Sequence, residues 1–90
     1  MNSIMICGRL TKDVEIKKTE NSVVGVFSIA DNYAKDDTMY WNCVVFGKQA
    51  ETLEKYKKKG DAITIVGNIT NEHYKDKIYT KIKVEHFYFN

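Results

Sequence analysis

Apolar and polar residues alternate with the two-residue period of β-strands over most of the chain. The alternating runs are rich in valine, isoleucine, phenylalanine and tyrosine, which strands favour, and clusters of polar residues separate them. Gly8 and Gly25 lie inside two of the runs, as expected where a strand bends or another backbone comes close. The pattern predicts strands at residues 4–10, continuing with a curve through Val14 and Ile16, and at residues 23–30, 40–46, 62–70 and 78–89.

One segment, residues 48–59, has a helical period instead. The apolar residues Ala50, Leu53 and Tyr56 recur every three positions, which places them along one face of a helix. Lysines fill the last predicted turn, and Gly60 follows at the position of a C-cap glycine. We therefore expect one helix, after the third strand.

Five strands with one helix between the third and the fourth predict an all-β fold. This is the element order of the five-stranded Greek-key barrel known as the oligonucleotide-binding (OB) fold. Ninety residues suffice for a single domain, residues 1–90, that buries one modest core without disulfides or metal. Residues 33–39 are predicted to be a polar loop before the third strand, and residues 74–77 a short turn before the fifth.

The charge of the chain indicates little by itself, because the formal net charge is only +2. Residues 57–59 are three consecutive lysines, and such a local cluster matters more than the sum because salt screens distant charges. Cys7 and Cys43 lie in apolar strand patterns and are predicted to be buried, reduced thiols. With no leader-like start and no apolar run near the length of a membrane span, the sequence predicts a cytoplasmic protein without membrane association.

No arrangement of residues typical of an enzyme is found. His73 and His86 are isolated, and the cysteines form no metal-ligand pattern with them. The carboxylates show no spacing that would identify a paired catalytic site. We therefore expect no catalytic residue, no metal, no cofactor and no small-molecule substrate.

The stretch Tyr40–Glu51 is the most informative part of the chain. Its predicted strand of aromatic and β-branched residues ends at Gly47, and the predicted helix follows. Lys48 lies at this junction, where it could bind a phosphate. Binding a single nucleic-acid strand without reading its sequence requires flat rings for stacking and cations along the backbone. Alternation puts Tyr40 and Phe46 on one face of the strand and Trp41 on the other. Both faces are apolar, so alternation alone leaves open which one is the core.

Three motifs carry a resemblance to a known family: Gly8–Asp13, Asn42–Val45 and Lys48–Glu51. In this order, within a match from Asn2 to Phe89, they resemble the bacterial and phage single-stranded-DNA-binding protein family. The resemblance implies an OB fold and sequence-independent binding and protection of single-stranded DNA in DNA replication, recombination or repair. It also implies a homo-oligomer, a tetramer or else a dimer. Cellular members carry an acidic C-terminal tail, so the resemblance implies a phage, plasmid or accessory version, or a trimmed chain.

Two other functions fit the same barrel. One is a replication-assembly adaptor resembling primosomal replication protein N, which uses the barrel mainly to contact other replication proteins. The other is an RNA-binding module, because stacking rings accept bases attached to either sugar. Direct competition between DNA and RNA would separate the RNA-binding module from a DNA-binding protein.

The resemblance also implies which residues bind nucleic acid. Its stacking aromatics fall on Tyr40, Phe46 and Tyr74, and on Tyr33 in the predicted loop, with packing in the core as the alternative for each. The family usually has a smaller or aliphatic residue at Trp41, which we expect to pack in the barrel or at a subunit interface rather than extend the stacking surface. The candidate phosphate-binding cations, for which a solvated surface position is the alternative, are Arg9, Lys12, Lys48, Lys59, Lys75 and Lys77.

Overall fold

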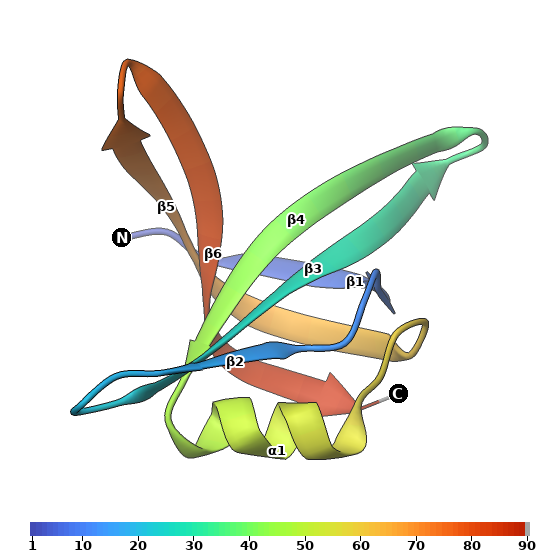
Figure 1. Cartoon of the computed structure of the whole chain (residues 1–90). Helices are drawn as coiled ribbons and strands as arrows, with labels where there is room; N and C mark the ends of the chain where they lie inside the picture. Colours follow the sequence, from blue (N-terminus) through green and yellow to red (C-terminus); the bar gives the residue numbers. More distant parts are fainter. Residues whose placement is uncertain (90) are drawn as a thin grey trace.

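The computed structural model describes residues 1–89, apart from the side chain of Tyr33, and has six strands and one helix within that part of the chain (Figure 1). Residues with strand-like alternation form the strands, and the segment with three-residue apolar spacing forms the helix. The elements in chain order are β1 (Ile4–Leu10), β2 (Glu15–Lys18), β3 (Val23–Ala34), β4 (Asp37–Phe46), α1 (Lys48–Tyr56), β5 (Ala62–Tyr74) and β6 (Lys77–Phe89).

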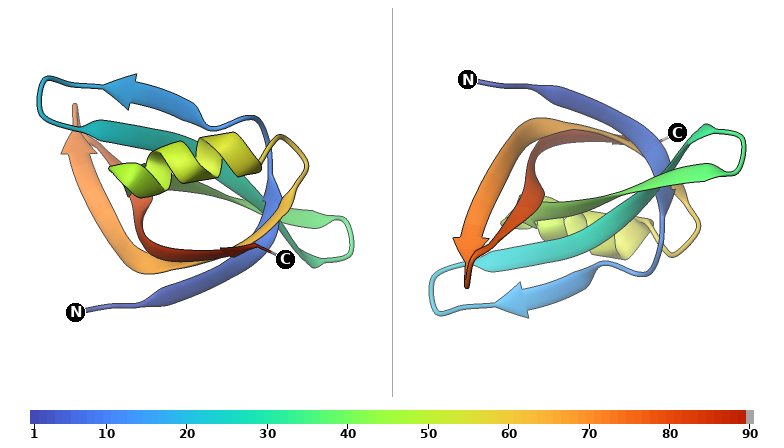
Figure 2. Two further views of the ribbon diagram at one scale, coloured as in Figure 1. Left: turned by 90° about the horizontal axis from the view of Figure 1, so that it is seen from below. Right: turned by 90° about the horizontal axis from the view of Figure 1, so that it is seen from above.

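The strands form one sheet in the order β1-β5-β6-β4-β3-β2. β1 also pairs with β3 at Arg9 and Leu10, and this contact closes β1, β5, β6, β4 and β3 into a barrel. All pairings are antiparallel except β4 with β6, where Val44 lies opposite Lys83. Figure 2 shows the ring of strands along its axis, with α1 across one end. The predicted OB fold is confirmed, and β2 is the continuation of the first predicted strand after a break at residues 11–14.

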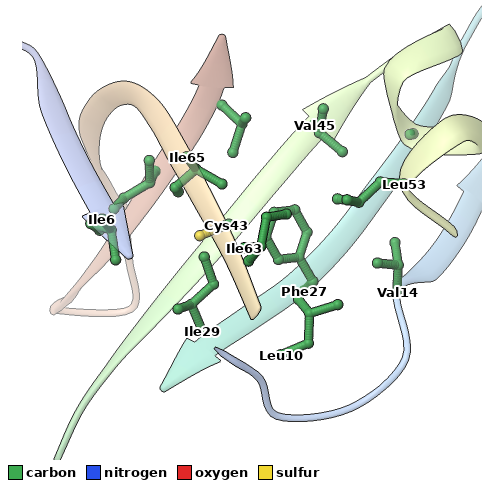
Figure 3. Close-up of a cluster of buried hydrophobic side chains, with 13 residues drawn as sticks. Ile6, Leu10, Val14, Phe27, Ile29, Cys43, Val45, Leu53, Ile63 and Ile65 are labelled. Carbon is green, nitrogen blue, oxygen red and sulfur yellow. The ribbon is translucent and has the colours of Figure 1, made fainter. Parts of the chain in front are cut away.

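The inward-facing side chains of the barrel strands converge on one core (Figure 3). Phe27 and Ile29 of β3 are at most 1% exposed, and Leu53 of α1 is fully buried where the helix covers one end of the barrel. Closure depends on Gly8, because a Cβ at this position would lie 2.4 Å from the carbonyl oxygen of Ala30. A residue without a side chain is therefore needed where β1 crosses β3, as the sequence predicts.

Two hairpins are longer than the sequence predicts. β3 runs to Ala34 and β4 begins at Asp37, so the predicted loop at residues 33–39 is wrong and most of it is strand. β5 and β6 likewise extend to a turn at Lys75 and Asp76, whose φ angles of 48° and 65° are typical of tight hairpin turns. The error has a physical reason, because strands exposed on both faces need no apolar alternation and are held by their backbone ladder.

The ends of these hairpins project from the barrel and diverge from each other (Figure 1). We call them the β3–β4 arm, residues 31–40, and the β5–β6 arm, residues 70–81. Every residue from 70 to 80 is exposed, so most of the β5–β6 arm contributes nothing to the core. The arms are therefore surfaces available for contacts outside the barrel.

The helix is shorter than predicted. α1 ends at Tyr56, and Lys57 is already extended although its N–H donates to the Leu53 carbonyl at 2.9 Å. Gly60, with a φ of 89°, shapes the turn before β5 and is not the helix C-cap. Lys57 is only 8% exposed, with its ammonium 4.8 Å from the ring centroid of Phe89, so its side chain is packed against the protein.

Within the described residues, no helix has the length and apolar character needed to cross a membrane.

The two cysteines have different environments. Cys43 is a buried free thiol on the inner face of β4, and burial raises its pKa to about 12 because apolar surroundings penalise the thiolate. Cys7 is a free thiol that is exposed on β1, so the prediction that it is buried is wrong. The inward residues of β1 are Ile6 and Leu10, and the strand period places Cys7 on the opposite face.

Candidate nucleic-acid interface

The outer face of β4 carries two of the predicted rings. Tyr40, Asn42, Val44 and Phe46 alternate outward, and the rings of Tyr40 and Phe46 belong to residues that are 67% and 45% exposed. Neither residue is part of the core. Trp41, on the inward face, is partly buried and packs against the core cluster. Closure of the barrel thus shows which apolar face of β4 points inward. Trp41 packs in the barrel, which is one of the two positions expected for it from the sequence.

The outer face continues from β4 onto β6. Their parallel pairing sets Val44 opposite Lys83, and the Lys83 ammonium lies over the Phe46 ring, 5.6 Å from its centroid. Lys81 lies two residues earlier on the same face, and its ammonium is 3.0 Å from the carboxylate of Glu72 on β5. The rings of β4 and the lysines of β6 are therefore neighbours on one surface.

The β5–β6 arm extends this surface away from the barrel. Tyr74 is 61% exposed and pairs with Lys77 at the end of the hairpin. The ammonium of Lys75 lies over the Tyr74 ring, 5.3 Å from its centroid. An exposed ring flanked by two lysines at a projecting tip is well placed to meet a flexible polyanion.

On its other side, the outer face of β4 continues through β3 to β1. Ala30 of β3 pairs with Tyr40 and also with Arg9, so these three residues form a row across the outside of the barrel. An open hollow lies where β1 meets β3, and Arg9 and Asn32 are among the residues that line it. Nη1 of Arg9 donates to the carbonyl of Gly60 at 2.9 Å, which holds the guanidinium against the loop between α1 and β5.

Lys12 and Lys59 lie on two loops that contact each other. The backbone N–H of Lys59 donates to the carboxylate of Asp13 at 2.8 Å, which joins the loop between α1 and β5 to the loop after β1. Both lysine residues are exposed. Since Arg9 bonds the same α1–β5 loop, the three cations lie at one edge of the barrel.

The predicted residues thus fall into two groups, joined by the row from Tyr40 to Arg9. The rings of β4 lie on the barrel, and Lys48 begins α1 directly after the Gly47 that follows Phe46. The side chain of Tyr33 lies outside the described residues, although its backbone is in β3. The face group comprises Tyr40, Phe46, Lys48, Tyr74, Lys75 and Lys77, and the edge group comprises Arg9, Lys12 and Lys59.

Lys83 lies on this surface beside the Phe46 ring, although it is not among the candidates predicted from the sequence. The alternation of Tyr79, Lys81 and Lys83 with Ile82 and other inward residues indicates that β6 has a polar face. That signal does not tell which strand lies beside the polar face. The parallel contact between β4 and β6, strands far apart in the sequence, brings Lys83 to a ring.

The surface has the two features that binding a single nucleic-acid strand requires. Exposed rings accept the flat face of any base, and nearby ammonium groups accept phosphate oxygens. Two acidic side chains on this side are already engaged: Glu72 with Lys81, and Glu85, whose carboxylate accepts a hydrogen bond from Asn68. Among residues 1–89, no three or more histidine, cysteine or acidic side chains come together as a metal site would require.

The fold is a small Greek-key barrel with exposed rings and lysines on its outer face. These features define a protein of the oligonucleotide-binding class. Residues 1–89 match the Single-strand binding protein family, and the chain belongs to that family.

Individual relatives agree with this assignment. The single-stranded DNA-binding protein of Borreliella burgdorferi is 38% identical over 85 residues, covering 86% of this chain and 57% of the relative. Single-stranded DNA-binding protein 1 of Lactococcus lactis is 35% identical over 91 residues, covering 93% of this chain and 61% of the relative. Single-stranded DNA-binding protein 3 of Streptococcus agalactiae is 34% identical over 99 residues, covering 97% of this chain and 72% of the relative. The chain spans about three fifths of the length of the first two relatives.

Proposed function

We propose that this chain binds single-stranded DNA without sequence preference and protects it during replication, recombination or repair. One observation carries the proposal: the rings of Tyr40 and Phe46 are exposed on the outer face of a barrel strand with a lysine beside them. Stacking on such rings tolerates every base. The names of the relatives support single-stranded DNA as the ligand. We place this activity in the cytoplasm, where bacterial DNA is replicated.

In this proposal the rings bind separate bases. Tyr40 and Phe46 are six residues apart on β4, which corresponds to about 20 Å at the usual rise of a strand. Each ring is therefore free to take its own base, while Tyr74 stacks another from the β5–β6 arm and Tyr33 another from the β3–β4 arm. The backbone that carries Tyr40 and Phe46 is already paired within the barrel, which limits the entropy lost when a base stacks.

The cations supply affinity that does not depend on sequence. Each phosphate that a lysine or arginine neutralises releases condensed counterions, so binding weakens as salt increases. The DNA backbone would run along the two groups of cations. Its path would start at the β5–β6 arm, pass the rings of β4 and end at the edge where β1 meets the α1–β5 loop. The proposed phosphate contacts are Lys75, Lys77 and Lys48 on the face and Arg9, Lys12 and Lys59 at the edge.

We further propose that the chain forms a homo-oligomer, a tetramer or else a dimer. β1 pairs with β5 along Ile4–Arg9 but with β3 only at Arg9 and Leu10, so within the described residues most of its second edge has no strand partner. Met5 is 66% exposed beside that edge and lies opposite the partly buried Val66. An open strand edge beside apolar residues is a surface that a second copy can cover.

Titration of a fluorescently labelled oligo-dT, followed by anisotropy, tests the DNA-binding proposal. Single strands should bind more tightly than duplex of the same length and show little preference among base compositions. Equal affinity for duplex would contradict the proposal. Tighter binding of oligo-rU than of oligo-dT in direct competition would favour the RNA-binding module. The absence of all nucleic-acid binding would leave the replication adaptor as the better interpretation.

A further inference from the structure

We propose that Lys83 is a phosphate-binding residue whose ammonium covers the Phe46 ring in the free protein and moves to the DNA backbone when a base stacks there. The inference deepens the proposed function and rests on it. It assigns a role to a lysine that neither the sequence motifs nor the predicted site includes. Its basis is the contact between this ammonium and the ring, 5.6 Å from the ring centroid.

The position of Lys83 is set by the backbone on both sides. It pairs with Val44 of β4 and with Asn68 of β5, so its side chain leaves the barrel between two strands of the outer face. The residue is exposed, and its ammonium has no carboxylate within ion-pair distance among the described residues. Lys81, by contrast, is paired with Glu72. Lys83 is therefore a cation on the β4–β6 face whose charge is available to a phosphate.

The ammonium and a nucleic-acid base compete for the same place. A cation over a ring and a base stacked on a ring both use the face of the π system. The contact of Lys83 with Phe46 is weak because water still reaches both groups, as the 45% exposure of Phe46 indicates. A stacked base can therefore displace the ammonium.

The displaced ammonium has a better partner nearby. A base that stacks on Phe46 brings its own phosphates with it, and a charge-assisted bond to a phosphate is stronger than a solvated cation–ring contact. The flexible stem of Lys83 allows the ammonium to turn from the ring to the backbone without moving β6. Stacking and phosphate binding would then occur as one step at this position.

Salt dependence of oligo-dT binding tests this role. With Lys83→Gln, the log–log slope of affinity against salt should fall by about 0.7, the value expected for the loss of one phosphate contact to a single strand. Lys55→Gln is the matched control, because the Lys55 ammonium also lies over a ring, that of Tyr56 at 5.2 Å, but on the helix. The control should keep the wild-type slope, and Lys83→Arg should restore it.

The double variant Phe46→Ala with Lys83→Gln tests the displacement itself. If binding breaks the ring contact, Phe46→Ala frees the lysine beforehand, and the double variant should bind about two- to fivefold more weakly than the two single effects multiplied together predict. Multiplicative effects, or an unchanged slope for Lys83→Gln, would overturn the inference while leaving the proposed function intact. Failure of the wild-type protein to bind oligo-dT would instead overturn the proposed function, and this inference with it.

Discussion

The aromatic residues of this barrel fall into an exposed set and a buried set, and residue type does not predict to which set a residue belongs. Phe46 and Phe27 belong to neighbouring paired strands, yet Phe46 is 45% exposed and Phe27 is 1% exposed. The difference is one of strand face, because alternate residues point into or out of the barrel. Removing an outward ring leaves no cavity, whereas removing an inward one does. The two kinds of ring therefore make opposite predictions for binding and for stability.

Phe46→Ala and Tyr74→Ala should each weaken binding of single-stranded DNA by about 1–3 kcal/mol, the usual contribution of one base stacked on one ring. Their unfolding transitions should stay close to that of the wild type. Phe27→Ala provides the contrast, because truncating a buried phenylalanine should lower the free energy of unfolding by about 3–5 kcal/mol. Oligo-dT titration and urea denaturation measure the two effects. If the Phe46 and Tyr74 variants unfold, or bind as the wild type does, the binding face is misplaced.

The thiols should differ in reactivity. A thiol reagent at pH 8 should label Cys7 in the native protein and reach Cys43 only after denaturation, because Cys43 is buried and its pKa is raised to about 12.

The raised pKa of Cys43 also makes the stability of the protein depend on pH. Above the ordinary value of 9.0 the unfolded chain loses this proton while the folded protein keeps it, so stability falls as the pH rises from 9 toward 12.

A comparison of the wild type with Cys43→Ala isolates this pH effect. Between pH 8 and pH 10.5, the free energy of unfolding should fall by roughly 1–2 kcal/mol more for the wild type than for the variant. Urea denaturation at both pH values measures the difference. An identical pH dependence for both proteins would show that Cys43 does not keep its proton on folding.

At the scale of elements, the sequence predicts what is buried and misses what is exposed. The barrel strands were predicted because one face must be apolar, and the helix because Ala50 and Leu53 face the barrel. The sequence predicts a loop at residues 33–39 of the β3–β4 arm and a turn at residues 74–77 of the β5–β6 arm, since residues such as Asp37 and Lys77 carry no pattern that distinguishes an exposed strand from a loop. Likewise the rings of β4 follow from the resemblance, but the contact of Lys83 with Phe46 depends on a pairing between distant strands.

The β5–β6 arm should be separable from the barrel. Glu72 lies opposite Tyr79, two pairs from the native turn, so residues 73–78 can be replaced by an Asn-Gly turn that joins these paired positions in the same register. Because every residue from 70 to 80 is exposed, the shortened protein should fold with nearly unchanged stability. It should bind oligo-dT more weakly and with a smaller salt slope, since Tyr74, Lys75 and Lys77 are lost. Unchanged affinity in the titration would exclude the arm from the interface.

At the scale of the whole molecule, local placement of charge matters more than its total. A net charge of +2 does not indicate a DNA-binding protein, but the fold brings cations from β1, two loops, α1 and the β5–β6 arm to one face and one edge. At physiological salt the screening length is about 8 Å, so a phosphate responds to these neighbours and not to distant acidic groups.

Assembly through β1 can be tested with one substitution at its outer face. Met5 is 66% exposed beside the unpaired edge, and a carboxylate there would lose part of its hydration if two copies of β1 pair along this edge. Light scattering at micromolar concentration should give an oligomer for the wild type and a smaller species for Met5→Glu. Met39→Glu is the control, because Met39 is also exposed, at 43%, but lies on the β3–β4 arm, and this variant should keep the wild-type mass. A monomeric wild type would refute the oligomer, whereas an oligomeric Met5→Glu variant would refute only the role of β1.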